Sequence, residues 1–435
     1  MDLTNLSQSE SFLDTFWNRK RVMPRFLEAR ASFAASEIHN LEEETAKALV
    51  QSGYLNSIQP GSDIAIAVGS RGIAGLAVMV RILVEKIRAA GGNPFIVPAM
   101  GSQGQSTGEG QEEVLRSLEI TSESVLAPIR SSMNVKQLGK TAHQVPIYID
   151  EQAFGADGII VINRVREHTD FDGPIQSGLM KMLAIGLGKA YGATAIHERG
   201  AGELHIHIPE VARQIIQSAP IALGIGVVEN GNGEIAAIRT ARPDQFENVD
   251  KELLTLAIKA TPRLPVEHLD VLVVRQIGKD LSGTGMDTKT VGRIRIPGAL
   301  EPLRPIIARI VALDLTEASH GNATGLYLAD ITTERLVSKI DYRSFYLNQL
   351  ASAHLEGGKI PLALSSEQEA IEVAMCIGPG YNSKELRVML IQDTKHLASF
   401  WVSESLIPEI EHCENIKLTS RPFNLAFDLQ GNLLS

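Results

Sequence analysis

An apolar strand, a short polar loop and an amphipathic helix follow one another twice in succession, and this order constrains the fold more than any other feature. Residues 63–69 (DIAIAVG) form an apolar run typical of a strand buried on both faces. Residues 73–87 then place their apolar side chains on one helical stripe. Residues 94–99 (PFIVPA) form the second apolar run, and Ser106 and Glu109 fit a capping box that opens the next helix. The order β-loop-α-β-loop-α predicts a parallel sheet flanked by helices.

The rest of the chain continues this alternation. Further strands are predicted at residues 157–163, 269–274, 308–313, 371–376 and 386–392, an antiparallel pair at residues 221–228 and 234–239, and a helix at residues 246–260. Residues 261–265 (TPRLP) are the best linker candidate. Because 435 residues are long for one domain, we expect the α/β class with two α/β domains of mostly parallel strands, residues 1–264 and 265–435. The active-site cleft is expected between them.

Charge and cysteine content argue against several classes of protein. The net charge of −10 argues against nucleic acid as a partner, and the longest apolar runs are far shorter than a membrane span. The first residues, MDLTNLSQSESF, lack the basic start and apolar core of a secretory signal. Cys376 and Cys413 are too few for a disulfide framework or a thiolate metal site. We therefore expect a cytoplasmic protein without a nucleic-acid or membrane partner.

Polar side chains follow the first two predicted strands, where a parallel sheet places its ligands. Arg71 stands in the loop GSRG after the first strand, and Gln103 stands in the loop after the second. Arg71 suits an anion clamp, and a surface arginine is the alternative interpretation. The glycine pattern matches neither a Walker A motif nor GxGxxG, so the sequence does not predict ATP or a classical dinucleotide as ligand.

Three groups that act on protons, metals or electrophiles lie in one glycine-rich stretch, namely His168, Lys181 and His197. Lys181 lies inside the apolar run LMKML. Its amine either snorkels from a helix or is desolvated and more nucleophilic. The glycines allow the backbone to approach something large. The alternative is a glycine-rich helix packed in the core, with surface histidines at its ends.

Two further histidines follow this stretch. His205 and His207 are two positions apart, so they point to different faces of a helix or to the same face of a strand. We interpret both as structural or solvated residues rather than metal ligands.

The chain resembles the nickel-pincer lactate racemase family in the order of these residues and of a pair that follows a later strand. The resemblance is greatest to the diverged branch of nickel-pincer-dependent isomerases. The resemblance rests on Arg71, Gln103, His168, Lys181, His197, Gln276 and Lys279. It spans most of the chain, except the lead-in and the extreme C-terminus. In that family a pyridinium-3,5-bisthiocarboxylic acid mononucleotide is tethered to a lysine as a thioamide. Nickel is held by its two sulfurs, a ring carbon and one protein histidine.

The resemblance implies a role for each residue of the central stretch. Lys181 is similar to the tethering lysine, and His197, sixteen residues later, is similar to the nickel ligand. His168 is similar to one of the two acid/base histidines. Ser177 and Gly178 lie beside the lysine and are expected to contact the cofactor.

The two flanking loops supply the remaining expected contacts. Arg71 resembles the arginine that meets the substrate, and Ser70 beside it is expected to contact the cofactor. Gln276 and Lys279 resemble the pair from the second domain that lies beside substrate and cofactor. Positive charge on Arg71 and Lys279 would orient a carboxylate.

One position departs from the family pattern. The second acid/base histidine belongs where this chain has Gln103, and a glutamine orients a hydroxyl but does not accept its proton near neutral pH. The acidic residue of the first loop is also absent, because Gly69 and Ser70 precede Arg71. Three interpretations stay open: another group acts as the base on that side, the substrate turns in the pocket, or the chain binds without isomerase turnover.

The resemblance implies a reaction in which a hydride moves from the carbinol carbon of a 2-hydroxy acid to the cofactor ring while a base takes the hydroxyl proton. The expected function is therefore a racemase or epimerase of a 2-hydroxy acid or sugar-like hydroxy compound. Its expected partners are that small molecule and the cofactor maturation enzymes. One alternative is a non-catalytic homologue that binds the pincer cofactor or a small anion. Another is a metal-free α/β enzyme in which Lys181 is a lysine at the edge of the core.

Overall fold

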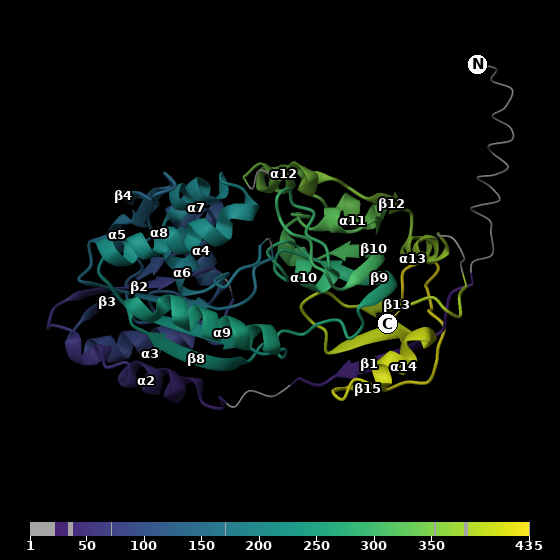
Figure 1. Ribbon diagram of the computed structural model, residues 1–435, viewed down its shortest axis with the longest axis horizontal. Helices are drawn as coiled ribbons and strands as arrows, with labels where there is room; N and C mark the ends of the chain where they lie inside the picture. Colours follow the sequence, from purple (N-terminus) through teal and green to yellow (C-terminus); the bar gives the residue numbers. More distant parts are fainter. Residues whose placement is uncertain are drawn as a thin grey trace, which may run out of the picture.

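The computed structural model describes residues 22–33, 38–70, 72–169, 171–351, 354–377 and 382–434. The expected substrate contact Arg71 lies outside the described residues. The described chain forms two α/β lobes, each built on one large sheet, which lie side by side in Figure 1. The expected α/β class, with helices and strands interleaved around mostly parallel sheets, is confirmed.

The first lobe contains a five-stranded sheet in the order β3-β2-β6-β7-β8. Its strands are β2 (Asp63–Val68), β3 (Asn93–Pro98), β6 (Gly158–Arg164), β7 (Ile221–Glu229) and β8 (Ile235–Ala241). The first four are mutually parallel, and β8 returns antiparallel to β7, as the predicted pair requires.

The parallel strands β2, β3, β6 and β7 carry apolar side chains on both faces, and both faces of this part of the sheet are covered. Ile64 and Ile66 of β2 pack with helix α3 (Leu76–Ala89), and Ala65 and Ala67 face the opposite side. The helices of the first lobe are α2 (Leu41–Gln51), α3, α4 (Gly108–Ser117), α5 (Glu151–Phe154), α6 (Leu179–Lys181), a π-helix (Met182–Gly186), α7 (Lys189–His197), α8 (Leu204–Ser218) and α9 (Phe246–Ala260). A separate hairpin consists of β4 (Val135–Lys140) and β5 (Pro146–Asp150).

The second lobe contains an eight-stranded sheet in the order β12-β11-β10-β9-β13-β14-β1-β15. Its strands are β9 (His268–Ile277), β10 (Ile306–Leu315), β11 (Ile331–Thr333), β12 (Leu362–Leu364), β13 (Val388–Ile391), β14 (Ser399–Ser403), β15 (Ile416–Leu418) and β1 (Phe26–Ala31). Its helices are α10 (Thr288–Val291), α11 (Glu334–Ser338), α12 (Tyr342–Ala351), α13 (Glu367–Cys376) and α14 (Ile407–Glu411).

Strand β1 pairs antiparallel with both β14 and β15, although it lies near the start of the chain. Figure 1 shows it in purple beside the yellow strands of the second lobe. The division at residues 264 and 265 stays a prediction, and these pairings place the lead-in strand with the second lobe.

Two local predictions need correction. Residues 371–376 are helical rather than a strand, because Ser366 caps α13 by accepting a hydrogen bond from the Glu369 N–H (3.1 Å) and the apolar residues also fit a helical stripe. The capping residue of α4 is Thr107 rather than Ser106. Among the described helices, none is long and apolar enough to cross a membrane.

Candidate functional site

A cavity of about 510 Å³ lies between the lobes, with walls from both. Four of the residues expected at the site line it, namely His168, Ser177, Lys181 and Lys279. Most other lining side chains are polar or charged, among them Asn163, Arg164, Arg166, Glu167, Glu229, Asp280, Asp287, Lys289 and His396. Cavities of 300–1,000 Å³ suit small-molecule ligands, so this volume accommodates a cofactor or substrate.

His168 lies on the cavity wall, four residues beyond the end of β6. Its backbone N–H donates to Oε1 of the buried Gln176 (2.6 Å). The imidazole stacks on Phe171, with ring centroids 4.4 Å apart. The backbone hydrogen bond and the stacking fix this histidine at the cavity, as a proton-transfer group requires.

Lys181 is held in place through the backbone just before it. The carboxylate of Asp250, on α9, accepts hydrogen bonds from the N–H groups of Leu179 and Met180, both at 2.9 Å. The carbonyl of Gly178 accepts a hydrogen bond from Nδ2 of Asn163 (2.7 Å). The turn that carries the lysine is therefore anchored on β6 and on α9.

The Asp250 carboxyl is almost completely buried. Burial raises its pKa to about 7, although the two N–H donors act in the opposite direction. A Cβ atom at position 178 would lie 2.3 Å from Asp250 Oδ1, so only glycine fits beside this carboxylate. The absence of a side chain at Gly178 therefore lets the Asp250 carboxylate reach the backbone of the turn that carries Lys181.

The other glycines of this stretch also pack against protein. A Cβ at position 186 would lie 2.7 Å from the Ala99 carbonyl oxygen, and one at position 188 would lie 2.6 Å from that of Ala184. The π-helix follows Lys181 directly, and such segments occur frequently at functional sites. Gly186 therefore lets the π-helix pack against the residue that follows β3, and Gly188 lets the start of α7 pack against the π-helix, where the sequence suggested room for something large.

Charged pairs connect the lobes beside His168. Arg166 contacts Asp287 (3.2 Å), and Lys289 contacts Asp172 (2.6 Å). The Thr288 hydroxyl also donates to the Thr169 carbonyl. Three consecutive positions of the second lobe thus contact the segment on either side of His168.

Burial shifts two of the charged groups in the cavity. Burial lowers the pKa of the Arg166 guanidinium, and the neighbouring Arg164 lowers it further. Burial raises the pKa of Glu167, although Arg263 opposes this. Arg164 pairs with Glu229 and Arg166 with Asp287, so carboxylates already face both arginines.

Lys279 reaches the cavity from the loop after β9. Its backbone N–H donates to the Ser319 hydroxyl (2.9 Å), and its ammonium donates to Oδ1 of Asn348 on α12. Gln276 lies on β9 itself, where its side-chain oxygen accepts a hydrogen bond from Gln392 (3.1 Å). Gln276 is not among the residues that line the cavity.

Other expected residues lie away from the cavity lining. Gln103 is exposed on the loop after β3, and His197 is half-buried as the last residue of α7. Ser70 is half-buried after β2, and Gly178 is buried beneath the lysine turn. Among the described members of the expected set, the cavity therefore brings together His168, Ser177, Lys181 and Lys279.

Sequence reasoning missed a buried network behind the Gln103 loop. Lys189 is fully buried, and its ammonium contacts Asp150 (3.1 Å), Oε1 of Gln111 (2.9 Å) and the Pro98 carbonyl (2.5 Å). The amide of Gln111 donates to the carbonyl oxygens of Gly101 (2.8 Å) and Gln103 (3.3 Å). Burial lowers the pKa of Lys189 and raises that of Asp150, and each charge opposes the shift of the other. This network fixes the Gln103 loop to the start of α7.

No family model and no curated protein matches the sequence. Among solved structures, the fold is similar to that of the lactate racemase apoprotein from Thermoanaerobacterium thermosaccharolyticum, with a TM-score of 0.52. The similarity covers 85% of this chain and 99% of that chain, at 14% sequence identity. The chain therefore has a lactate-racemase-like fold.

Proposed function

We propose that the protein is an isomerase, a racemase or epimerase that acts at a hydroxyl-bearing carbon of a 2-hydroxy acid or a sugar-like compound. The observation that carries this proposal is the cavity between the lobes, where His168, Lys181 and Lys279 line one space. The fold shared with a lactate racemase supports the same reaction class. The inter-lobe position is also where small-molecule sites commonly form.

The proposed cofactor is the nickel-pincer nucleotide, tethered to Lys181. Three observations fit it: Lys181 lies on the wall, the cavity volume suits a mononucleotide, and the lining carries several cations that suit a phosphate. His197 does not line the cavity, so its role as the nickel ligand is proposed from the resemblance alone; a neutral imidazole suits this ion. When bound, the cofactor supplies a ring that accepts and returns a hydride.

The residues of the chain would bind the substrate and move its proton. His168 is the proposed base for the hydroxyl proton, because an imidazole titrates near neutral pH. The ammonium of Lys279 would bind a carboxylate of the substrate, and Arg71 is proposed for the same anion. Gln103 is exposed and does not line the cavity, and the resemblance is the ground for proposing that it orients a second hydroxyl rather than accepts a proton.

A second candidate function is binding without turnover. The exposed Gln103, in place of the second base, favours it. In that case the protein would hold the pincer cofactor or a small anion in the cavity and catalyse no inversion.

Isomerisation of a labelled substrate tests the proposal. Enantiopure 2-hydroxy acids and sugar acids that carry deuterium at the carbinol carbon would be incubated with protein matured in its native host. We expect inversion with the deuterium retained, because a hydride returns to the same carbon. Lys181→Ala should abolish inversion, whereas the control Lys47→Ala, an exposed lysine that does not line the cavity, should preserve it. Inversion with loss of deuterium to solvent would refute the hydride mechanism, and no inversion of any substrate would favour binding alone.

A further inference from the structure

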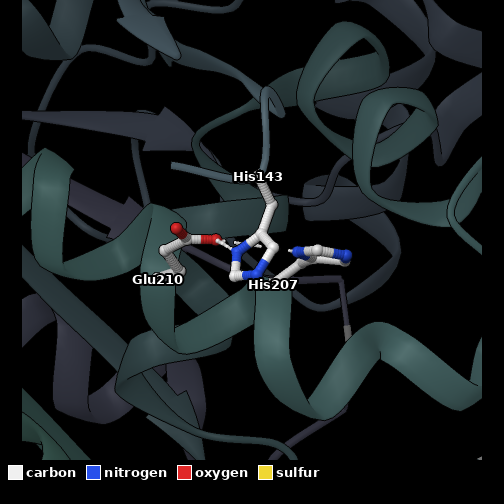
Figure 2. A group of neighbouring side chains, drawn as sticks. All are labelled: His143, His207 and Glu210. Carbon is white, nitrogen blue, oxygen red and sulfur yellow. Dashed lines mark hydrogen bonds and ion pairs between the residues drawn. The ribbon is translucent and has the colours of Figure 1, made fainter. Parts of the chain in front are cut away.

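A group of side chains that could bind a metal ion lies on the first lobe, and its members are not among the residues that line the cavity. It comprises His143, His207 and Glu210, whose ligand atoms all lie within 4.8 Å of one another. His143 belongs to the turn between β4 and β5, and the other two lie on α8. Figure 2 shows the two imidazoles and the carboxylate converging on one point. His207 and Glu210 are three positions apart, so they share one face of the helix.

The separations suit a small tetrahedral ion. Glu210 Oε2 lies 3.0 Å from His143 Nδ1 and 3.7 Å from His207 Nδ1. Zinc binds histidine nitrogen at about 2.0–2.1 Å and carboxylate oxygen at about 2.0–2.2 Å, so ligands at tetrahedral corners are about 3.3 Å apart. The two observed separations bracket this value.

The buried imidazole of His207 gives independent evidence for a ligand. Its side chain is only 3% exposed, yet Nδ1 has no hydrogen-bond partner among the described residues. On the other side of the ring, Nε2 lies 2.9 Å from a carboxylate oxygen of Glu203. That carboxylate favours a proton on Nε2, which leaves a lone pair on Nδ1 directed towards Glu210. A lone pair and a carboxylate repel each other unless a proton or a cation lies between them.

We propose that His143, His207 and Glu210 bind one divalent cation of the zinc class; for His207 this replaces the interpretation drawn from the sequence, which took it as a structural or solvated residue. Two imidazoles and a carboxylate are a ligand set that zinc uses, and Glu203 would fix the orientation of His207 from outside the coordination sphere. Because His143 is 60% exposed, the fourth position faces solvent. The ion would link the β4–β5 turn to α8, which packs against α6, the helix that ends at Lys181, and against the π-helix that follows it. It would therefore stabilise the element that carries the proposed cofactor lysine.

Zinc titration of the chelator-treated full chain tests this site. We expect one Zn²⁺ per chain, a higher melting temperature with the ion, and tetrahedral absorption bands when Co²⁺ replaces it. His143→Ala should weaken binding at least tenfold while the apo protein keeps its stability, because this side chain is exposed. Glu203→Gln should weaken binding by about 10–100-fold, as outer-shell carboxylates do. The matched control His205→Ala, exposed on the same helix, should bind as wild type does.

A further variant separates this site from the proposed nickel site. His197→Ala should keep the bound Zn²⁺, because His197 is not one of the three ligands. Equal zinc binding by wild type and His143→Ala would overturn the proposal. Loss of the zinc in His197→Ala would also overturn it, by assigning the ion to the other site.

Discussion

Asp250 accepts hydrogen bonds from two successive N–H groups just before Lys181, in a nearly fully buried position. The sequence signal for this role is an aspartate on the apolar stripe that Phe246, Leu253 and Leu254 form along the helix, but that signal does not identify the hydrogen-bond donors. Its contacts come from a segment about 70 residues away along the chain, and only the packing of α9 against the π-helix region brings the two together. The stability of the lysine turn thus depends on a residue that motif reasoning leaves out.

The pH dependence of stability tests this role of Asp250. Its pKa rises from an ordinary 3.8 to about 7 on folding, so the folded state holds the proton more tightly than the unfolded state. Its contribution to stability is complete below pH 4 and is lost as the pH rises to about 7, by at most about 1.4 kcal/mol per pH unit. Chemical denaturation gives the free energy of unfolding of wild type and of Asp250→Asn at each pH. As the pH rises across this window, wild type should lose stability relative to the variant. A difference that does not change with pH would contradict this assignment.

Replacement of His168 tests the proposed base. His168→Ala should lower turnover by about 100-fold or more, because a positioned base contributes that factor, while the cofactor stays attached to Lys181. Steady-state kinetics and intact mass measure the two quantities. The control is His396→Ala, which removes another histidine from the same cavity wall. Equal turnover of His168→Ala and wild type would remove His168 from the mechanism.

Among the elements, strands β2, β3, β6 and β7 of the first lobe were predictable because each is largely a continuous apolar run between polar loops; the β4–β5 hairpin, whose β4 (VKQLGK) is mostly polar, was not predicted. The same reasoning failed at α13, where a short apolar run fits either a strand or a helix and Ser366 decides between them. The pairing of β1 with β14 and β15 was not predictable, because it joins segments nearly 400 residues apart. For the site, local pattern identified His168, Lys181 and Lys279 on the wall, but not the buried groups that hold them.

The turn before the π-helix is expected to be intolerant of a side chain. Gly178→Ala would place a Cβ 2.3 Å from the Asp250 carboxylate and should destabilise the protein by about 1–3 kcal/mol. Thermal unfolding measures the effect. Gly155→Ala is the control, because its Cβ would make an ordinary contact 3.5 Å from the nearest atom. Equal melting temperatures for the two variants would show that the turn shifts freely.

At the scale of the whole molecule, the cavity exists because the two lobes meet beside His168. The ion pairs Arg166–Asp287 and Lys289–Asp172 connect them there, and the buried Lys289 lies on the cavity wall. We therefore expect that losing an ion pair between the lobes also weakens the binding of substrate in the cavity.

Lys289→Ala tests that coupling. Removal of a buried ammonium paired across the lobes should raise the KM for an anionic substrate and increase hydrogen exchange in α10, with a smaller effect on kcat. Kinetics and hydrogen-exchange mass spectrometry provide the readouts. Lys395→Ala, an exposed lysine on the same cavity, is the control. Unchanged exchange and KM in Lys289→Ala would show that these contacts do not control the cavity.

We propose that the cavity holds a nickel-pincer nucleotide that is tethered to Lys181. The most direct measurement is intact mass and metal content of protein matured in its native host, with peptide mapping of the modified residue. We expect a covalent adduct on Lys181, with nickel, that is absent from Lys181→Ala; His197→Ala should keep the adduct and lose the nickel. An unmodified chain without nickel would contradict the account, as would an adduct on any other lysine.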